Sequence, residues 1–165
     1  DFVGSRGLGD VYKRQLIINE DLKMIKHLLL LVSMQLCLLL SVSANDYLAS
    51  PENAQVYFIS PHDGATVETA FSVKFGLKGM GVAPAGTMRE HTGHHHLLIN
   101  MDINDIDMNQ SLPATEQIKH FGGGQTEAVI ELTPGTYTLQ LLLGNYAHVP
   151  HDKPVLSDKI TVKVE

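Results

Sequence analysis

The 165-residue chain has one cysteine, no tryptophan, and fewer basic than acidic residues, with Lys+Arg 12 against Asp+Glu 18. A single cysteine excludes an internal disulfide framework and any zinc finger that uses several cysteines. The formal net charge of -6 argues against nucleic acid or anionic lipid as the main partner, because either would require a basic surface. Histidine, in contrast, is abundant, with nine residues that are unevenly placed along the chain.

A secretory signal peptide is predicted over residues 24–44. A short positive region starts at Met24, 13 uncharged and mostly apolar residues follow from Leu28 to Leu40, and Val42-Ser43-Ala44 supplies the small residues of a cleavage site. A membrane-spanning helix usually needs about 20 apolar residues, which this run does not reach. We therefore expect cleavage after Ala44, a periplasmic or secreted protein, and no stable membrane span afterwards. An uncleaved anchor is the alternative.

Residues 1–23 precede this signal and show no pattern that predicts structure. The stretch VGSRGLGDVYKRQ, from Val3 to Gln15, resembles a translated sequencing adapter, and we interpret 1–23 as a non-native upstream translation. The expected mature chain, Asn45–Glu165, carries 7 Lys+Arg against 14 Asp+Glu, eight histidines and no cysteine. An apolar core alone must therefore stabilise it, and a domain of this length is large enough to have one.

The mature chain predicts an all-β fold. After a polar lead-in at 45–54, short apolar runs alternate with polar residues at a period of two and are separated by Gly, Pro and Asp turns. This pattern favours a single domain at 55–165, an immunoglobulin-like antiparallel β-sandwich of about 6–7 strands. The expected strands are 56–59, 71–77, 97–101, 128–132, 137–143 and 160–164. The less regular segment 103–121 is expected to hold one short helical turn or an extra edge strand.

A Pro-Gly turn at Pro134-Gly135 gives a local detail of this fold. It predicts a hairpin between 125–132 and 136–144. With Tyr137 it also resembles the corner of immunoglobulin-like domains in which a tyrosine hydroxyl bonds to nearby backbone. An ordinary Pro-Gly turn is the alternative.

The histidines of the mature chain form three clusters, which chain direction predicts at one end of the domain. A strand should run away from His120, the turn at Pro134-Gly135 should reverse the direction of the chain, and the next strand should return toward His148 and His151. In an immunoglobulin-like sandwich the loop 79–93 opens at the same end, which would bring the first cluster there. The clusters are His91 with His94–His96; His120; and His148 with His151.

Converging imidazoles without a thiolate are typical of a site for copper or zinc, and nickel would also fit. Because side chains alternate along a strand, we expect His95 to share the core face with Leu97, Ile99 and Met101. The candidate metal ligands are His94, His96, His120, His148 and His151.

Other interpretations remain open. Histidine-rich loops can be solvated turns or pH sensors, and Gly122–Gly124 could cradle an anion. The domain could instead be a non-enzymatic envelope module that recognises a ligand. A metal-dependent enzyme with three histidines and Glu90 or Glu127 as base is a further alternative, but an enzyme is the less favoured class, because the sequence has no pattern typical of a catalytic nucleophile.

Five phrases in order carry a family resemblance: FGLKGMGVAPAGT (75–87), TGHHHLLIN (92–100), HFGGGQTE (120–127), LTPGTYTLQLLLGN (132–145) and HVPHDKPVLSDKITV (148–162). Together they resemble a secreted bacterial family known only as domain of unknown function 4399. The resemblance covers roughly residues 55–165 and implies an exported bacterial domain. It brings no activity, substrate or catalytic residue to this chain.

Overall fold

A computed structural model of the chain describes residues 22–32 and 47–165. The chain divides into two units, Asp1–Ala44 and Asn45–Glu165. In the first unit, residues 22–32 form a helix. No helix in the described residues is long and apolar enough to span a membrane. Most of the predicted non-native segment 1–23, and the predicted cleavage site after Ala44, lie outside the described residues. Both therefore stay predictions.

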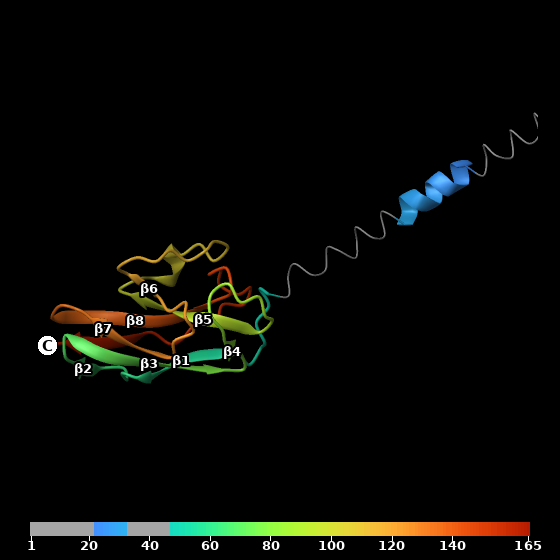
Figure 1. Cartoon of the computed structure of the whole chain (residues 1–165). Helices are drawn as coiled ribbons and strands as arrows, with labels where there is room; N and C mark the ends of the chain where they lie inside the picture. The colour runs from blue at the N-terminus through green and yellow to red at the C-terminus, as the bar shows by residue number, and fades with distance from the viewer. Residues whose placement is uncertain (1–21, 33–46) are drawn as a thin grey trace, which may run out of the picture. The chain divides into compact units, whose positions relative to one another are not determined.

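The second unit is all-β, as predicted, and its strands form two sheets that pack together (Figure 1). The smaller sheet has the order β1-β3-β7, and the larger has the order β2-β9-β8-β5-β4, with β6 paired to β5. The strands are β1 (Gln55–Ser60), β2 (Ala65–Val67), β3 (Ala70–Lys78), β4 (Gly81–Val82), β5 (Thr92–Ile99), β6 (Ile118–His120), β7 (Glu127–Glu131), β8 (Gly135–Gly144) and β9 (Ile160–Val164).

All six strands expected from the period-two pattern are present. The additional strands β2, β4 and β6 have only two or three residues each, too few for alternation to be visible in the sequence. The longer pairs are antiparallel, but β2 joins β9 and β4 joins β5 in parallel. The finer immunoglobulin-like arrangement stays a prediction.

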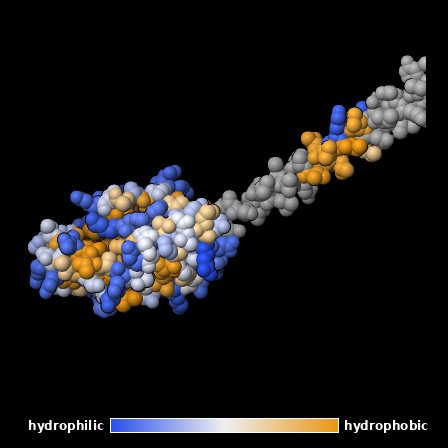
Figure 2. Space-filling model, in the orientation of Figure 1, coloured by the Kyte–Doolittle hydropathy of each residue, from blue (hydrophilic) through white to orange (hydrophobic). Residues whose placement is uncertain are grey.

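The core lies between the two sheets and follows from this alternation. Val73 of the smaller sheet, and Leu97 and Leu139 of the larger one, are fully buried and belong to one apolar cluster. Burying a side chain of this size stabilises the fold by about 1.5–3 kcal/mol. Figure 2 shows that, on the visible face of this unit, hydrophilic residues surround scattered hydrophobic patches.

The predicted hairpin between β7 and β8 is wrong. β7 pairs with β3 in the smaller sheet, and β8 pairs with β5 and β9 in the larger sheet. The turn at Pro134-Gly135 therefore crosses from one sheet to the other. A Pro-Gly turn predicts that the chain reverses direction, but not whether the next strand joins the same sheet (a hairpin) or the facing sheet (an arch). Both strands bury one face in either case, so the sequence does not distinguish the two. The Tyr137 hydroxyl bonds to the Thr133 hydroxyl at 2.9 Å, a side-chain partner in place of the expected backbone one.

A second apolar cluster covers the outer face of the larger sheet and determines the surroundings of the histidines. Leu98 on β5 and Leu142 on β8 pack there against Leu112 and Ile118. These partners come from the segment between β5 and β7, whose part up to β6 lies over the larger sheet on the side away from β1 and β3 (Figure 1). Both forms expected in this segment occur, because it contains a 3-10 turn at Ile103–Asp105 and the edge strand β6.

Met101 does not lie on the core face as expected, and packs against this second cluster. Strand β5 ends at Ile99, and Asn100 adopts a left-handed φ of 51°. The Asn100 side-chain oxygen accepts a hydrogen bond from the Thr138 backbone at 2.8 Å. This conformation, which asparagine tolerates better than most residues, interrupts the alternation before Met101.

Candidate metal centre

Strand β5 carries the histidine triplet with both of its faces covered. His94, His95 and His96 are 0% exposed. His94 and His96 share the outer face with Leu98, whereas the His95 ring lies 5.0 Å from the Phe75 ring in the core, as the sequence predicted. On the neighbouring strand β8, His94 lies opposite Gly144 and His96 opposite Leu142.

His120 reaches the same face through strand pairing. It is the last residue of β6, and its register partner on β5 is His96. The two rings are stacked with centroids 5.1 Å apart, and the His120 centroid is 5.0 Å from that of His94. His120 is thus a strand residue, more exposed than the two buried histidines.

His148 approaches from the loop after β8. The buried Asn145 organises this loop, because its side-chain oxygen accepts hydrogen bonds from the backbone N–H groups of Ala147 and Val149. The His148 N–H donates to the Asn145 carbonyl at 2.9 Å. His148 itself has a left-handed φ of 66°, a conformation that non-glycine residues rarely adopt and that often occurs at functional sites.

The four rings have the spacing of a shared coordination site. Their centroid separations run from 4.6 Å, between His120 and His148, to 6.1 Å, between His96 and His148. Four imidazoles around one ion, with metal–nitrogen bonds of about 2.0–2.1 Å, would place their centroids roughly 5 Å apart. One nitrogen each from His94, His96 and His120 lies within 4.8 Å of the others. This limit is wider than the roughly 3.4 Å that tetrahedral bonds of about 2.0–2.1 Å would give, so metal binding would draw the three rings closer.

The ring nitrogens of the two buried histidines are available to a ligand. Neither Nδ1 nor Nε2 of His94 or His96 has a hydrogen-bond partner. A buried polar group without a partner costs about 1–3 kcal/mol, and such groups are rare unless they serve a function. The ring nitrogens of both residues therefore have lone pairs that no protein group uses and that could bind an ion.

Burial keeps these rings neutral. Desolvation is the largest cause that lowers the pKa of His94 to about 4 and that of His96 to about 3, and the charges of neighbouring histidines lower both further. Desolvation and the charge of His148 also lower the pKa of His120. Only the neutral imidazole binds a metal, so the three rings are in the ligand form at neutral pH.

Two glycines leave space for these rings. A Cβ on Gly144 would lie 2.7 Å from Cε1 of His96, and a Cβ on Gly122 would lie 2.3 Å from Cε1 of His120. Both distances are too short for real contacts, so any larger residue would displace the ring. These glycines contribute to the site through their lack of a side chain, which sequence reasoning did not identify.

His151, a predicted ligand, is not brought into this four-histidine cluster. It is buried, and its Nδ1 lies 3.2 Å from the Leu48 carbonyl, whereas its Nε2 has no partner. The ring thus contacts the segment that precedes β1. The turn at Tyr146-Ala147 comes before His148, and the chain then forms a bridge from Pro150 to Gly144, after which His151 follows. His62 and His91, which were not predicted as ligands, are exposed.

The residues proposed for other chemistry lie in ordinary structural settings. Glu127 is exposed and lies 3.8 Å from Lys74 in an ion pair across β3 and β7. In the glycine loop, the Gly123 N–H donates to the Gln125 side chain at 2.9 Å and the Gly124 N–H donates to the Phe121 carbonyl. These donors are used inside the loop, which weakens its interpretation as an anion cradle.

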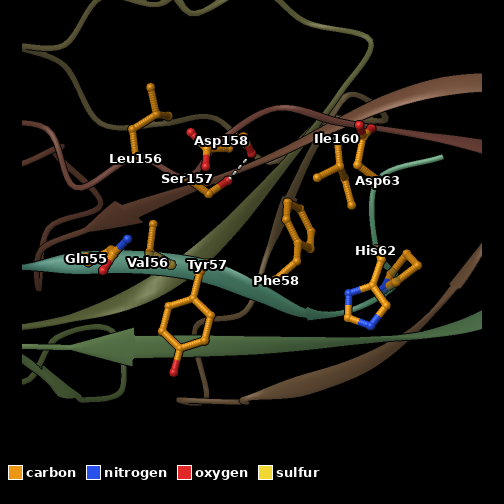
Figure 3. Close-up of a pocket in the computed structure, with 11 residues that line it drawn as sticks. Gln55, Val56, Tyr57, Phe58, His62, Asp63, Leu156, Ser157, Asp158 and Ile160 are labelled. Carbon is orange, nitrogen blue, oxygen red and sulfur yellow. Dashed lines mark hydrogen bonds between the residues drawn. The ribbon is translucent and has the colours of Figure 1, made fainter. Parts of the chain in front are cut away.

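A separate hollow of about 210 Å³ lies between β1 and the segment before β9. Figure 3 shows Tyr57, Phe58 and His62 on one side of it and Ser157 and Asp158 on the other, with the Ser157 hydroxyl bonded to the Asp158 carbonyl. None of the four clustered histidines lines this hollow, and it carries no arrangement of ligands comparable to theirs.

The pKa shifts predict how pH affects the metal-free protein. Unfolded histidines titrate near pH 6.5, but the folded pKa is about 4 for His94 and His95 and about 3 for His96. Below pH 6.5 the unfolded state therefore binds more protons, and the free energy of unfolding should fall by up to about 1.4 kcal/mol per pH unit for each ring. Urea unfolding between pH 8 and 4.5 measures this. His95→Leu should make the dependence shallower, and a constant free energy across this range would contradict it.

Comparison with known proteins identifies the family. No curated protein and no solved structure matches the chain. A family of unknown function matches residues 73–165, more than half of the sequence, and this region contains all four clustered histidines. The resemblance seen in the sequence is thereby confirmed: the chain belongs to the family described as domain of unknown function DUF4399.

Proposed function

We propose that the domain binds one transition metal ion through His94, His96 and His120, with His148 as a fourth ligand. The observation that supports this most directly is the convergence of imidazoles whose buried ring nitrogens have no protein partner. Copper and zinc fit a site of nitrogen donors without a thiolate. Since the leader pattern favours export, we infer a periplasmic or secreted protein that serves metal handling or protection.

Metal titration tests this proposal. With Zn(II) or Cu(II) at pH 7.5, we expect one ion per chain and a higher melting temperature, because an ion at 100 times its Kd stabilises the folded state by about 2.7 kcal/mol. A chelator should reverse the shift. His62→Asn alters an exposed histidine outside the cluster and should leave both values unchanged. Absence of stoichiometric metal, with an unchanged melting temperature, would contradict the proposal.

A recognition module is the second candidate, and one surface favours it. Tyr57 and Ile59 on β1 and Val129 on β7 are 42%, 50% and 67% exposed on the outer side of the smaller sheet. The Tyr57 ring lies over Gly76, where a Cβ would be only 2.2 Å from it. This patch has one aromatic side chain, and none of its three side chains has a buried polar atom that lacks a hydrogen-bond partner. It therefore supports ligand binding less specifically than the histidine cluster does.

A metal-dependent enzyme receives less support than either. The candidate base Glu127 pairs with Lys74, and Glu90 lines a different hollow, beside Met80 and His91. Neither carboxylate is among the groups whose charge acts on the rings of His94, His96 or His120. A general base must come within hydrogen-bond reach of the proton that it removes.

A further inference from the structure

Among residues 47–165, no negatively charged group adjoins the histidine cluster to balance a metal ion. Within residues 47–165, the charged groups that act on His94, His96 and His120 are all other histidines. Ligating histidines usually donate their second ring nitrogen to a carboxylate or a carbonyl. Neither ring nitrogen of His94 has such a partner.

This neutrality has a consequence for a bound ion. Four neutral imidazoles leave the full charge of a dication in place, and uncompensated charge in a poorly solvated site is unfavourable. Metal sites in proteins commonly reduce the ion's charge through thiolate or carboxylate ligands. Within residues 47–165 neither kind of ligand joins the three histidines, so we expect the compensating charge to come from solution.

The cluster has one side through which a small ligand can arrive. His94 and His96 form its buried floor, whereas His148 is half-buried and His120 is more exposed than the floor residues. A ligand would therefore reach the ion from the solvent-exposed side of the cluster, where His120 and His148 lie.

We propose that the centre, once loaded with a dication, takes up a small monoanion from solution as an additional ligand at the His120–His148 side. This inference rests on the metal-binding function proposed above. The anion donates a lone pair to the metal and replaces water or fills an open position, so the charge of the centre falls from +2 to +1. No covalent bond in the protein forms or breaks.

Position 148 allows a matched test of the charge argument. Its left-handed φ of 66° is tolerated best by asparagine and aspartate among the non-glycine residues, so His148→Asn and His148→Asp should both fold. The two variants differ mainly in charge. Aspartate brings an internal anion to the mouth of the site, and asparagine does not.

The experiment titrates azide into Cu(II)-loaded protein, produced from the full chain, and follows the azide-to-copper charge-transfer absorption. We expect saturable binding in the wild type and in His148→Asn, and at least a 10-fold weaker azide affinity in His148→Asp. Without azide or other added anions, His148→Asp should bind Cu(II) at least 10-fold more tightly than His148→Asn.

The outcomes separate this inference from the proposed function. If no Cu(II) binds to the wild type, the metal-binding function itself fails. If Cu(II) binds stoichiometrically but azide produces no new absorption in the wild type, the function stands and the anion inference is wrong. Azide binding in His148→Asn alone would show that His148 closes the site and would also overturn the inference, as would equal azide affinities in His148→Asn and His148→Asp.

Discussion

Replacing His96 with leucine should reduce the affinity for Zn(II) or Cu(II) at least 100-fold and, in the same protein, raise the stability of the metal-free form. The loss in affinity, about 2.7 kcal/mol, follows from removing one of the three histidines that share the site. The gain in stability follows because both ring nitrogens of His96 are buried without partners, at a cost of about 1–3 kcal/mol. Leucine would extend the apolar surface that Leu98 and Leu142 form on this face.

His95→Leu is the matched control for this variant. The two positions are adjacent on β5 and equally buried, and His95 also has two ring nitrogens without partners. Its ring faces the core beside Phe75, so His95→Leu should stabilise the fold without weakening metal binding. Isothermal titration and chemical unfolding of both variants measure these effects. Equal metal affinities in the two variants would contradict the assignment of the outer face of β5 as the metal face.

Gly144→Ala should weaken metal binding by about 10- to 100-fold and destabilise the fold by about 1–3 kcal/mol, the usual range for overpacking. The new methyl group would lie 2.7 Å from Cε1 and 3.2 Å from Nδ1 of His96, and 3.4 Å from the backbone of His148. Because the His96 ring is fully buried, it has little room to move away from this methyl group. The ring and the loop of His148 would therefore both be displaced from the positions that bind metal.

Gly135→Ala provides the control at the other end of β8. A Cβ added at Gly135 would lie 3.4 Å from the Tyr137 side chain, which is an ordinary contact. No histidine is among the nearest atoms to this Cβ. We expect its metal affinity to equal that of the wild type. Thermal unfolding and zinc titration of both variants make the comparison. A Gly144→Ala protein with normal affinity would show that the space beside His96 is not needed for metal binding.

The sequence predicted the fold where alternation persists over five or more residues. In the run 71–77 buried and exposed residues alternate from Phe71 to Phe75, and in 137–143 the apolar residues Leu139, Leu141 and Leu143 all belong to the core between the sheets. This period requires no knowledge of the partner strand. The pairing of β7 with β3 was not predictable in the same way, because the Pro134-Gly135 turn fits a hairpin and an arch equally well. The immunoglobulin-like resemblance therefore supported the class of fold more than its details.

The candidate site was predictable in part for the same reason. Alternation along β5 separated His94 and His96 from His95, and chain direction placed His120 and His148 at a common end. Two contributions depended on tertiary structure: the short strand β6, which sets His120 opposite His96, and the Asn145 loop, which directs His148 but not His151 toward the cluster. Neither has a period or a motif that a single sequence reveals.

The central claim is that three or four imidazoles bind one metal ion, and X-ray absorption of zinc-loaded protein tests it most directly. With one zinc per chain, the account predicts a first shell that contains three or four nitrogens at about 2.0–2.1 Å with the outer-shell scattering of imidazole rings. His96→Leu should lose one imidazole from this first shell at the same zinc loading, and His95→Leu should keep the wild-type number. A first shell of oxygen atoms alone, or the same spectrum in both variants, would contradict the account.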